Sequence, residues 1–158
     1  MIRGFQPDDA DLLAELCRAS IRELGSRRYS PEQVAAWHNR APDSSDYLAR
    51  VARGHRIFVS EADSEIAAYA LLEPDGHLDR LFCHPRHAGK GHASALLAHA
   101  EKEALHSGLT RLHTEASEVA RAVFERAGYL VDHRRDFDMN GVAIHNYAMS
   151  KVLDPQVR

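Results

Sequence analysis

Residues 81–97 read LFCHPRHAGKGHASALL, and this stretch decides the fold more than any other part of the chain. An apolar run ends at Pro85 and small and apolar residues follow Gly91, so the pattern predicts a strand, a loop and a helix over about residues 91–106. Unpaired backbone N–H groups at a helix start, with the positive end of the helix dipole, favour a phosphate or pyrophosphate. Gly89 and Gly91 would let the backbone approach such an anion closely, and Lys90 adds positive charge.

The spacing of these glycines fits an ordinary strand-to-helix turn equally well. A Walker loop is excluded because no GxxxxGKS/T sequence occurs, and a Rossmann fingerprint is excluded because GxGxxG is absent. Support for an anion site must therefore come from the rest of the chain.

The segments on either side show hydrophobic periodicity and turn residues. Strands are predicted over residues 1–5, 55–62, 65–73, 77–85, 110–116, 129–138 and 143–153, and further helices over residues 12–24, from 31, over 45–53 and after 117. Residues 30–33, SPEQ, form a capping box at one helix start, and Ser117 is expected to cap another helix. Asn140-Gly141 predicts a hairpin turn between the last two strands. This order predicts an α/β domain with a mixed sheet.

The composition is that of an ordinary globular protein, with 44% hydrophobic and 27% charged residues. A length of 158 residues suits a single domain over residues 1–158. The net charge of −3 predicts no nucleic-acid surface, and no apolar run resembles a signal peptide or a membrane span. Cys17 and Cys83 lack CxxC spacing and predict neither a disulfide framework nor a metal knuckle, so a cytoplasmic location is expected.

The loop resembles the signature motif of the GNAT superfamily of acyl-CoA N-acyltransferases, Q/R-x-x-G-x-G/A, which falls here on AGKGHA at residues 88–93. AVFERAGY at residues 122–129 is similar to the family's helix ending in FYExxGF, and the predicted order of elements matches the family over nearly the whole chain. Residues 29–38 and 145–153 resemble a bacterial YafP-like branch. The resemblance implies a GNAT-type fold, a mixed, mostly antiparallel central sheet flanked by helices, with acetyl-CoA as cosubstrate and no metal.

The resemblance also implies a set of residues that hold acetyl-CoA. Backbone groups on the strand before the loop would pair with the pantetheine arm, the loop and helix start would hold the pyrophosphate, and two residues further on would line the thioester. In that order, the residues are Leu81, Phe82 and Cys83; Ala88, Gly89, Lys90, Gly91, His92, Ala93 and Ser94; and Ser117 and Phe124.

Two positions depart from the family pattern. Ala88 replaces the usual Gln or Arg, which should weaken pyrophosphate binding and leaves Lys90 or Arg86 to compensate. Phe124 stands where many members have a tyrosine that protonates the leaving thiolate. Tyr147 is a candidate substitute, with packing in the sheet as the alternative; a thiol pKa near about 8.5 also permits unassisted departure.

The family reaction is a direct attack of a neutral amine on the thioester, which requires positioning, an oxyanion donor and a proton acceptor. By position the resemblance implies the backbone N–H of Cys83 as oxyanion donor. Glu115 and Asp79 are the candidate bases, with a solvated or ion-paired role as the alternative for each. Trp37, Tyr29 and Tyr47 are candidates for shaping the acceptor site, with core packing as the alternative.

Histidines 92, 99 and 106 recur every seven residues on the predicted helix, about 10 Å apart along its axis and too far to share one ion, so no metal site is predicted. The leading hypothesis is an acetyl-CoA-dependent N-acetyltransferase acting on a small-molecule or protein amine. The alternative is a catalytically silent acyl-CoA-binding module, which Phe124 favours. A nucleic-acid or membrane partner is not expected, and a homodimer is left open.

Overall fold

The computed structural model describes residues 1–156. The strands are β1 (Ile2–Gly4), β2 (Arg56–Ala62), β3 (Glu65–Leu72), β4 (Leu78–Cys83), β5 (Arg111–Ala116), β6 (Leu130–Met139) and β7 (Val142–Val152). The α-helices are α1 (Ala10–Glu23), α2 (Pro31–Asn39), α3 (Ser44–Ala52), α4 (His92–His106) and α5 (Arg121–Arg126), and the 3-10 turns are η1 (Pro7–Asp9), η2 (Gly25–Arg27) and η3 (Pro85–His87). The predicted order of strands and helices is confirmed.

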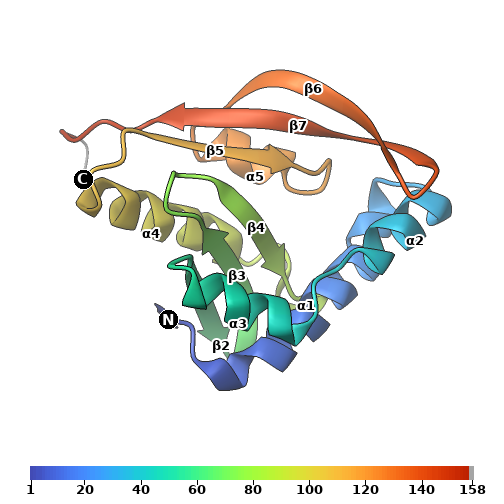
Figure 1. Cartoon of the computed structure of the whole chain (residues 1–158), viewed down its shortest axis with the longest axis horizontal. Helices are drawn as coiled ribbons and strands as arrows, with labels where there is room; N and C mark the ends of the chain where they lie inside the picture. Colours follow the sequence, from blue (N-terminus) through green and yellow to red (C-terminus); the bar gives the residue numbers. More distant parts are fainter. Residues whose placement is uncertain (157–158) are drawn as a thin grey trace.

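The strands form two antiparallel sheets, in the order β1-β2-β3-β4 and β5-β7-β6. The expected mostly antiparallel sheet flanked by helices is therefore confirmed, with a division between β4 and β5. Figure 1 shows these two strands lying close together at one end and diverging toward the other. The divergence opens a gap in the middle of the fold, next to the predicted anion loop.

A glycine lets the two sheets meet at the closed end of this gap. An isolated parallel bridge joins His77 to His113, and the His113 N–H donates to the Gly76 carbonyl at 3.1 Å. Gly76 has φ +102°, and a Cβ there would lie 2.5 Å from the backbone oxygen of Arg111. The buried Thr114 hydroxyl donates to the Leu78 carbonyl at 2.7 Å and fixes the same junction. Any larger residue at position 76 would push the sheets apart, because the obstacle is backbone.

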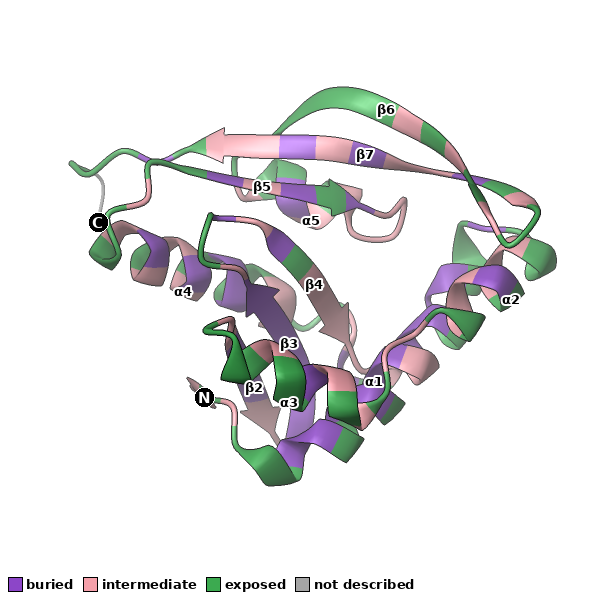
Figure 2. Cartoon of the chain, in the orientation of Figure 1, coloured by how far each residue is buried: buried purple, intermediate pink, exposed green. Residues whose placement is uncertain are grey.

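Two apolar cores cover the faces of the first sheet (Figure 2). Strand β3 lies inside this sheet, and its residues 66–72 are all buried. Ala68 and Ala70 pack in the core with α4, whereas Tyr69 and Leu71 pack in the core with α1 and α3. Side chains alternate along a strand, so one apolar run serves both cores. Burial of a leucine such as Leu71 stabilises the fold by about 1.5–3 kcal/mol.

Local signals set several element boundaries as the sequence predicts. The Ser30 hydroxyl accepts from the Gln33 N–H at 3.2 Å and the Gln33 side chain accepts from the Ser30 N–H at 2.9 Å, so the capping box is confirmed. Asn140 and Gly141 both have positive φ in the β6–β7 turn. Ser117 does not cap α5: its hydroxyl accepts from the Ala120 N–H at 3.1 Å in a turn that precedes the helix. Among residues 1–156, no helix combines the length and the apolar character that a membrane crossing needs.

Candidate active site

The loop between β4 and α4 borders a cavity of about 450 Å³, here called the loop cavity. Most of the residues that the sequence assigned to acetyl-CoA line it. These are Leu81, Phe82, Cys83, Ala88, Gly89, Gly91, His92, Ala93, Ser94 and Ser117. Lys90 is exposed and is not in this lining, and Phe124 lines a neighbouring pocket instead.

The start of α4 presents backbone N–H groups at this cavity. Gly91 occupies the N-cap position with no side-chain cap, and the Ala95 N–H donates to the Gly91 carbonyl at 3.1 Å as the first bond of the helix. The N–H groups of residues 92–94 precede that bond and have no partner within the helix. Gly89 and Gly91 have φ of +76° and +87°, and a Cβ on either would meet no atom within 4 Å. The residues present therefore fit an anion: the donors are exposed, and space lies in front of them.

The 3-10 turn before the loop is tied to β3 by one carboxylate. Glu65 accepts from Arg86 at 2.7 Å and pairs with His87 Nε2 at 2.6 Å. His87 is buried and lines the loop cavity, so this pair holds the loop against the sheet. The hydrogen bond from His87, with the Arg86 charge, lowers the pKa of Glu65. Arg86 is thus committed to an ion pair, which weakens its case as a substitute for the missing Gln or Arg at position 88.

Two arginines that the sequence did not single out also line the loop cavity. Arg27 comes from η2 and Arg126 from the end of α5. Both lie far along the chain from the glycine loop, so no local motif could have identified them. They place positive charge at the wall of the same cavity that the N–H groups at the start of α4 border.

The edge of β4 that faces the gap carries unpaired backbone groups. The His84 N–H donates to Ala67 on β3 at 2.8 Å, and Phe82 lies opposite Tyr69. Because N–H and C=O groups alternate direction along an antiparallel strand, Leu81 and Cys83 direct theirs away from β3. The backbone groups of these two residues are therefore available to pair with an extended ligand, as the sequence analysis expects. Burial raises the pKa of the Cys83 thiol, which disfavours its use as a nucleophile.

A second pocket of about 140 Å³, here called the side pocket, lies on the other side of the same strand edge. Its walls come from β4, the end of β5, the start of α5, the β6–β7 hairpin and the α2 region. Leu81, Phe82, Ser117, Ala120 and Trp37 line both spaces. The two spaces therefore meet where β4 and β5 diverge.

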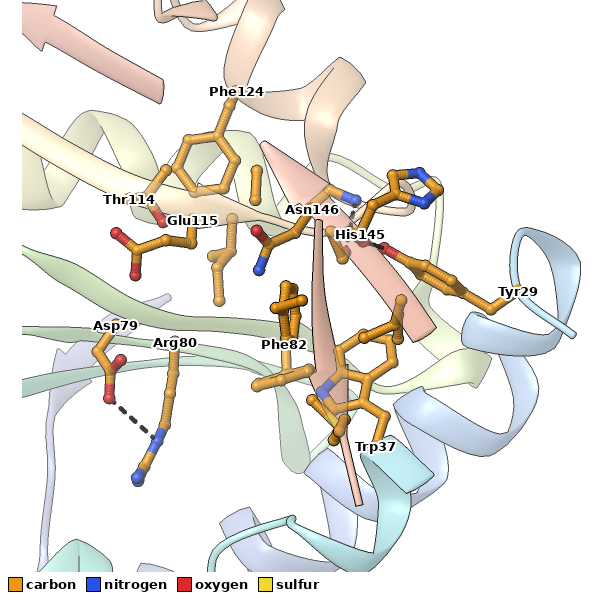
Figure 3. A pocket seen from close by; sticks show the side chains of 17 residues that line it. Tyr29, Trp37, Asp79, Arg80, Phe82, Thr114, Glu115, Phe124, His145 and Asn146 are labelled. Atoms are coloured by element: carbon orange, nitrogen blue, oxygen red, sulfur yellow. Dashed lines mark hydrogen bonds and ion pairs between the residues drawn. The ribbon is translucent and has the colours of Figure 1, made fainter. Parts of the chain in front are cut away.

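Two carboxylates stand at one end of the side pocket. Figure 3 shows Asp79 and Glu115 at this end, Tyr29 and Trp37 at the other, and Phe82 and Asn146 between them. Both candidate bases are thus brought into one pocket, on the two diverging strands.

A protonated histidine holds Glu115. His77 Nε2 lies 2.8 Å from Glu115 Oε1, and His77 Nδ1 lies 3.1 Å from Glu73 Oε2. Carboxylates only accept, so both ring nitrogens donate, and the hydrogen bonds with Glu115 and Glu73 raise the pKa of His77 to about 9. The same hydrogen bond lowers the pKa of Glu115. Asp79 pairs with Arg50 at 2.9 Å, so its charge is compensated.

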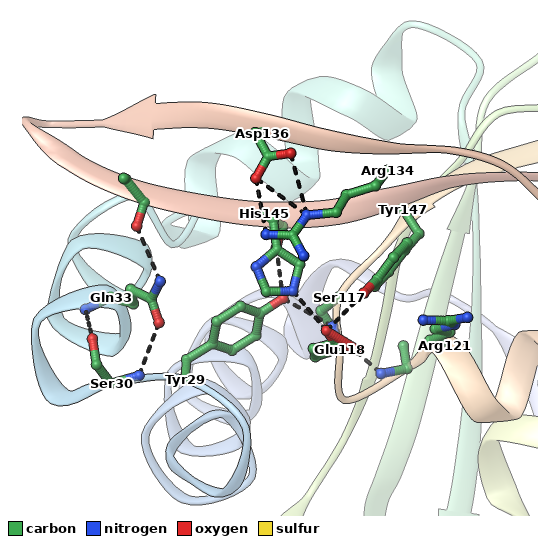
Figure 4. Close-up of polar contacts among 12 residues, drawn as sticks. Tyr29, Ser30, Gln33, Ser117, Glu118, Arg121, Arg134, Asp136, His145 and Tyr147 are labelled. Carbon is green, nitrogen blue, oxygen red and sulfur yellow. Dashed lines mark hydrogen bonds and ion pairs between the residues drawn. The ribbon is translucent and has the colours of Figure 1, made fainter.

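A hydrogen-bonded network fixes the outer wall of the side pocket (Figure 4). The buried Tyr29 hydroxyl donates to the His145 carbonyl at 2.9 Å and accepts from the Glu118 N–H at 2.8 Å. Gln33 donates to the Ala143 carbonyl at 3.0 Å. The start of α2 is thereby attached to β7 and to the turn after β5. Tyr29 is one of the residues expected from the sequence to shape the acceptor site, and it lies in the wall of the side pocket.

Glu118 is a hydrogen-bonded carboxylate that the sequence did not single out, and it lies outside the lining of both spaces. Its Oε2 accepts from the Tyr147 hydroxyl at 2.9 Å and lies 2.6 Å from His145 Nε2. Burial alone would raise the pKa of Glu118, but the bonds from His145 and Tyr147 outweigh it and lower the pKa. The partners of Glu118 lie on β7, far along the chain, so the sequence does not show these contacts. Its position next to Ser117 is the one feature of the sequence that draws attention to it.

The aromatic residues that the sequence analysis singled out lie either in the wall of the side pocket or in the hydrophobic core. Trp37 lines both spaces, with its ring 5.7 Å from that of Tyr29. Tyr47 is fully buried with Tyr69 in the core on the far face of the first sheet, so its expected place in the acceptor region is wrong. Phe124 is buried with its ring 5.0 Å from that of Tyr129, and it lines the side pocket. Tyr147 is buried and lies outside the lining of both spaces.

The histidines on α4 have separate partners. His92 Nδ1 lies 3.0 Å from the Ser60 hydroxyl, and the ring of His99 lies edge-on to Phe58 at 4.8 Å. Within the part of the chain that the structure describes, no group of three or more His, Cys, Asp or Glu residues could hold a metal ion.

Comparisons with known proteins find the same fold and the same kind of domain. A family model described as an acetyltransferase (GNAT) domain matches residues 26–151. The uncharacterized N-acetyltransferase YafP of Escherichia coli strain K12 is 26% identical over 148 residues, which cover 94% of this chain and 93% of that protein.

Solved structures agree with this match. The crystal structure of a GCN5-related N-acetyltransferase from Rhodopseudomonas palustris superposes with a TM-score of 0.87 at 32% identity, covering 97% of this chain and 95% of that one. The structure of YncA, a putative acetyltransferase from Salmonella typhimurium with its cofactor acetyl-CoA, has a TM-score of 0.76 at 19% identity, covering 98% and 94%.

Proposed function

Because this chain belongs to the GNAT family of acetyltransferases, whose domain model matches residues 26–151, we propose that it transfers the acetyl group of acetyl-CoA to a primary amine. The resemblance stated from the loop and from residues 122–129 is confirmed, and the chain is an acyltransferase. The YncA structure with acetyl-CoA supports acetyl-CoA as the donor. The acceptor and the residues that carry out the reaction are the substance of the proposal.

One observation carries the proposal: the loop cavity and the side pocket meet along the gap between β4 and β5. The loop cavity has the N–H donors for the acyl donor, and the side pocket has carboxylates for an amine. Leu81, Phe82 and Ser117 belong to both walls, so a thioester placed beside them would lie within reach of an amine in the side pocket. Holding two reactants in this way is itself a large part of catalysis.

In the loop cavity, the N–H groups at the start of α4 would hold the pyrophosphate. Arg27 and Arg126 would add positive charge that Ala88 does not supply, and Lys90 would act from outside the lining. The outward-facing groups of Leu81 and Cys83 would pair with the pantetheine arm as an added strand does, and the N–H of Cys83 would face the developing oxyanion.

In the side pocket, Glu115 is the proposed acceptor for the proton that the amine must lose. His77 keeps Glu115 ionised, and the second oxygen, Oε2, is left to face a substrate. A lowered pKa makes Glu115 a weak base, so its contribution includes attraction of the cationic amine to the site. Asp79, on the opposite strand, adds to that attraction although Arg50 compensates its charge.

The leaving thiolate has no phenol beside it at position 124. Tyr147 donates its hydroxyl to Glu118, which favours packing of the sheet over a direct part in protonation. Unassisted departure of a thiolate, with a thiol pKa of about 8.5, is therefore the proposed route.

A thermal-shift series with acetyl-CoA, CoA, ATP and buffer tests the donor. Ligand at about a hundred times its Kd stabilises by about 2.7 kcal/mol, which raises Tm by several degrees. A rise with acetyl-CoA and CoA alone supports the proposal, and no rise at saturating CoA contradicts it. Release of free thiol with an amine then separates a transferase from a catalytically silent acyl-CoA-binding module, which Phe124 alone favours.

A further inference from the structure

The side pocket is small, and polar and apolar groups contribute about equally to its surface. Its volume of about 140 Å³ is close to the roughly 150 Å³ of a protein cavity that binds benzene. The apolar part of the wall comes from four segments of the chain and consists of Trp37, Leu81, Phe82, Phe124, Phe137, Met139 and Ile144. This part of the wall disfavours a branched, heavily hydrated acceptor, because burying unpaired polar groups against these side chains costs free energy.

The charged side chains of the pocket favour an amine over an anion. Of the lining residues, all of which the structure describes, the one arginine is Arg80, and it is paired with Asp46 and stacked on Tyr47 at 4.9 Å. Glu115 keeps one oxygen for a ligand. The Asn146 oxygen accepts from Arg135 at 2.9 Å, which leaves the Asn146 amide hydrogens as donors.

We propose that the acceptor is a primary monoamine on a compact apolar body the size of a single aromatic ring, with no carboxylate beside the amine. The proposal rests on the function proposed above. The amine would lie at the end marked by Asp79 and Glu115 (Figure 3). The ring would lie against Phe82, Phe137 and Ile144, which line the same pocket. Polyamines are disfavoured because their remaining charges would face apolar walls, and α-amino acids because their carboxylate would find no unpaired cation.

The outer wall makes this selection rigid. Tyr29 and Gln33 attach the start of α2 to the carbonyls of His145 and Ala143, on the strand that carries Ile144 and Asn146. The wall therefore cannot retreat from a bulky acceptor without breaking hydrogen bonds, one of them at a buried hydroxyl.

A matched set of acceptors tests the proposal by release of free thiol from acetyl-CoA. Phenethylamine and phenylalanine differ by one carboxylate, and spermidine and a lysine-containing peptide represent the other amine classes. We expect kcat/KM for phenethylamine to exceed that for phenylalanine by about a hundredfold, the scale set by one buried charge left without a partner. A higher kcat/KM for phenylalanine, spermidine or the peptide would overturn the inference and leave the proposed function standing.

Two variants show that the preference arises in the side pocket. Phe137 lines the side pocket and not the loop cavity, so Phe137→Trp should fill the space and raise KM for phenethylamine while the acetyl-CoA thermal shift persists. Leu130→Trp is the control: it adds bulk on the same strand at a site that is 74% exposed, and it should change neither readout. An unchanged KM in Phe137→Trp would contradict the assignment of the pocket.

Thiol release and amine binding distinguish failure of the proposed function from failure of the proposed acceptor class. If no amine releases thiol, the proposed function fails, and binding of phenethylamine to the CoA-loaded protein is then measured by saturation-transfer NMR. Binding that Phe137→Trp abolishes would still support the acceptor class, and absence of binding would overturn it.

Discussion

Gly91→Val tests the placement of the anion site, and its cost can be worked from the backbone. Gly91 has φ +87°, and an added Cβ would meet no protein atom within 4 Å. The stability cost is therefore conformational: about 1–2 kcal/mol for a side chain in the left-handed region, and toward the upper end for a β-branched one. For a domain of this size that lowers Tm by about 2–8 °C. The variant should remain folded and lose acetyl-CoA binding, because the valine side chain would occupy the space in front of the N–H donors.

A matched variant separates the two effects. Gly108, at the other end of α4, has φ +81° and also has no atom within 4 Å of an added Cβ, and it lies outside the lining of both spaces. Gly108→Val should thus show a similar loss of stability and keep the full rise in Tm with acetyl-CoA, about 5–10 °C at a hundred times Kd. Thermal unfolding of wild type and both variants, with and without acetyl-CoA, measures each term.

One outcome of this experiment would contradict the placement of the anion site. If Gly91→Val shows the same acetyl-CoA-dependent rise as Gly108→Val, the space in front of residue 91 is not where the donor binds. The N–H groups of residues 92–94 would then be an ordinary helix start facing solvent.

Four further changes have expected outcomes. Phe124→Tyr should keep acetyl-CoA binding and raise kcat for thiol release, because a phenol can protonate the leaving thiolate; loss of binding would show that this side chain does not border the thioester. Glu115→Gln should lower kcat, most at low pH where the amine is hardest to deprotonate, and an unchanged pH–rate profile would remove it as the proton acceptor. The pKa of His77 is raised from 6.5 to about 9, so its contribution to stability is complete below pH 6.5 and is lost as pH rises through 9; urea unfolding over this range should show a decline that His77→Gln lacks. Tyr29→Phe leaves a backbone N–H and a carbonyl without a partner and should lower the free energy of unfolding by about 1–3 kcal/mol in urea, whereas a change within error would mean that water replaces the hydroxyl.

Much of the fold could be predicted because its signals are local. The capping box of residues 30–33 and the Asn140-Gly141 turn each depend on neighbours in the chain, and each is found as expected. The error at Ser117 shows the limit: a serine before a helix can serve a turn just as well, and the choice depends on where the chain must go next.

The candidate site was predicted in part for the same reason. The loop and its glycines are contiguous, so the wall of the loop cavity was accessible to sequence reasoning. Tyr47 was misplaced because an aromatic residue on an amphipathic helix has the same pattern whether its helix packs on a core or borders a pocket. Arg126 was missed because nothing near it in the chain marks its place in the wall of the loop cavity.

By itself, the sequence determined the order of strands and helices, the glycine loop at the start of α4 and membership in an acyltransferase family, because hydrophobic period, turn chemistry and motif spacing are properties of consecutive residues. Only the tertiary structure decided that Gly76 marks the place where β4 and β5 begin to part, that Asp79 and Glu115 face one pocket, and that His77 is the residue holding Glu115. These relations join strands whose contact depends on how two sheets and their helices pack. The proposed acceptor site, and the kind of amine proposed for it, therefore rest on packing between distant segments and not on any one stretch of the chain.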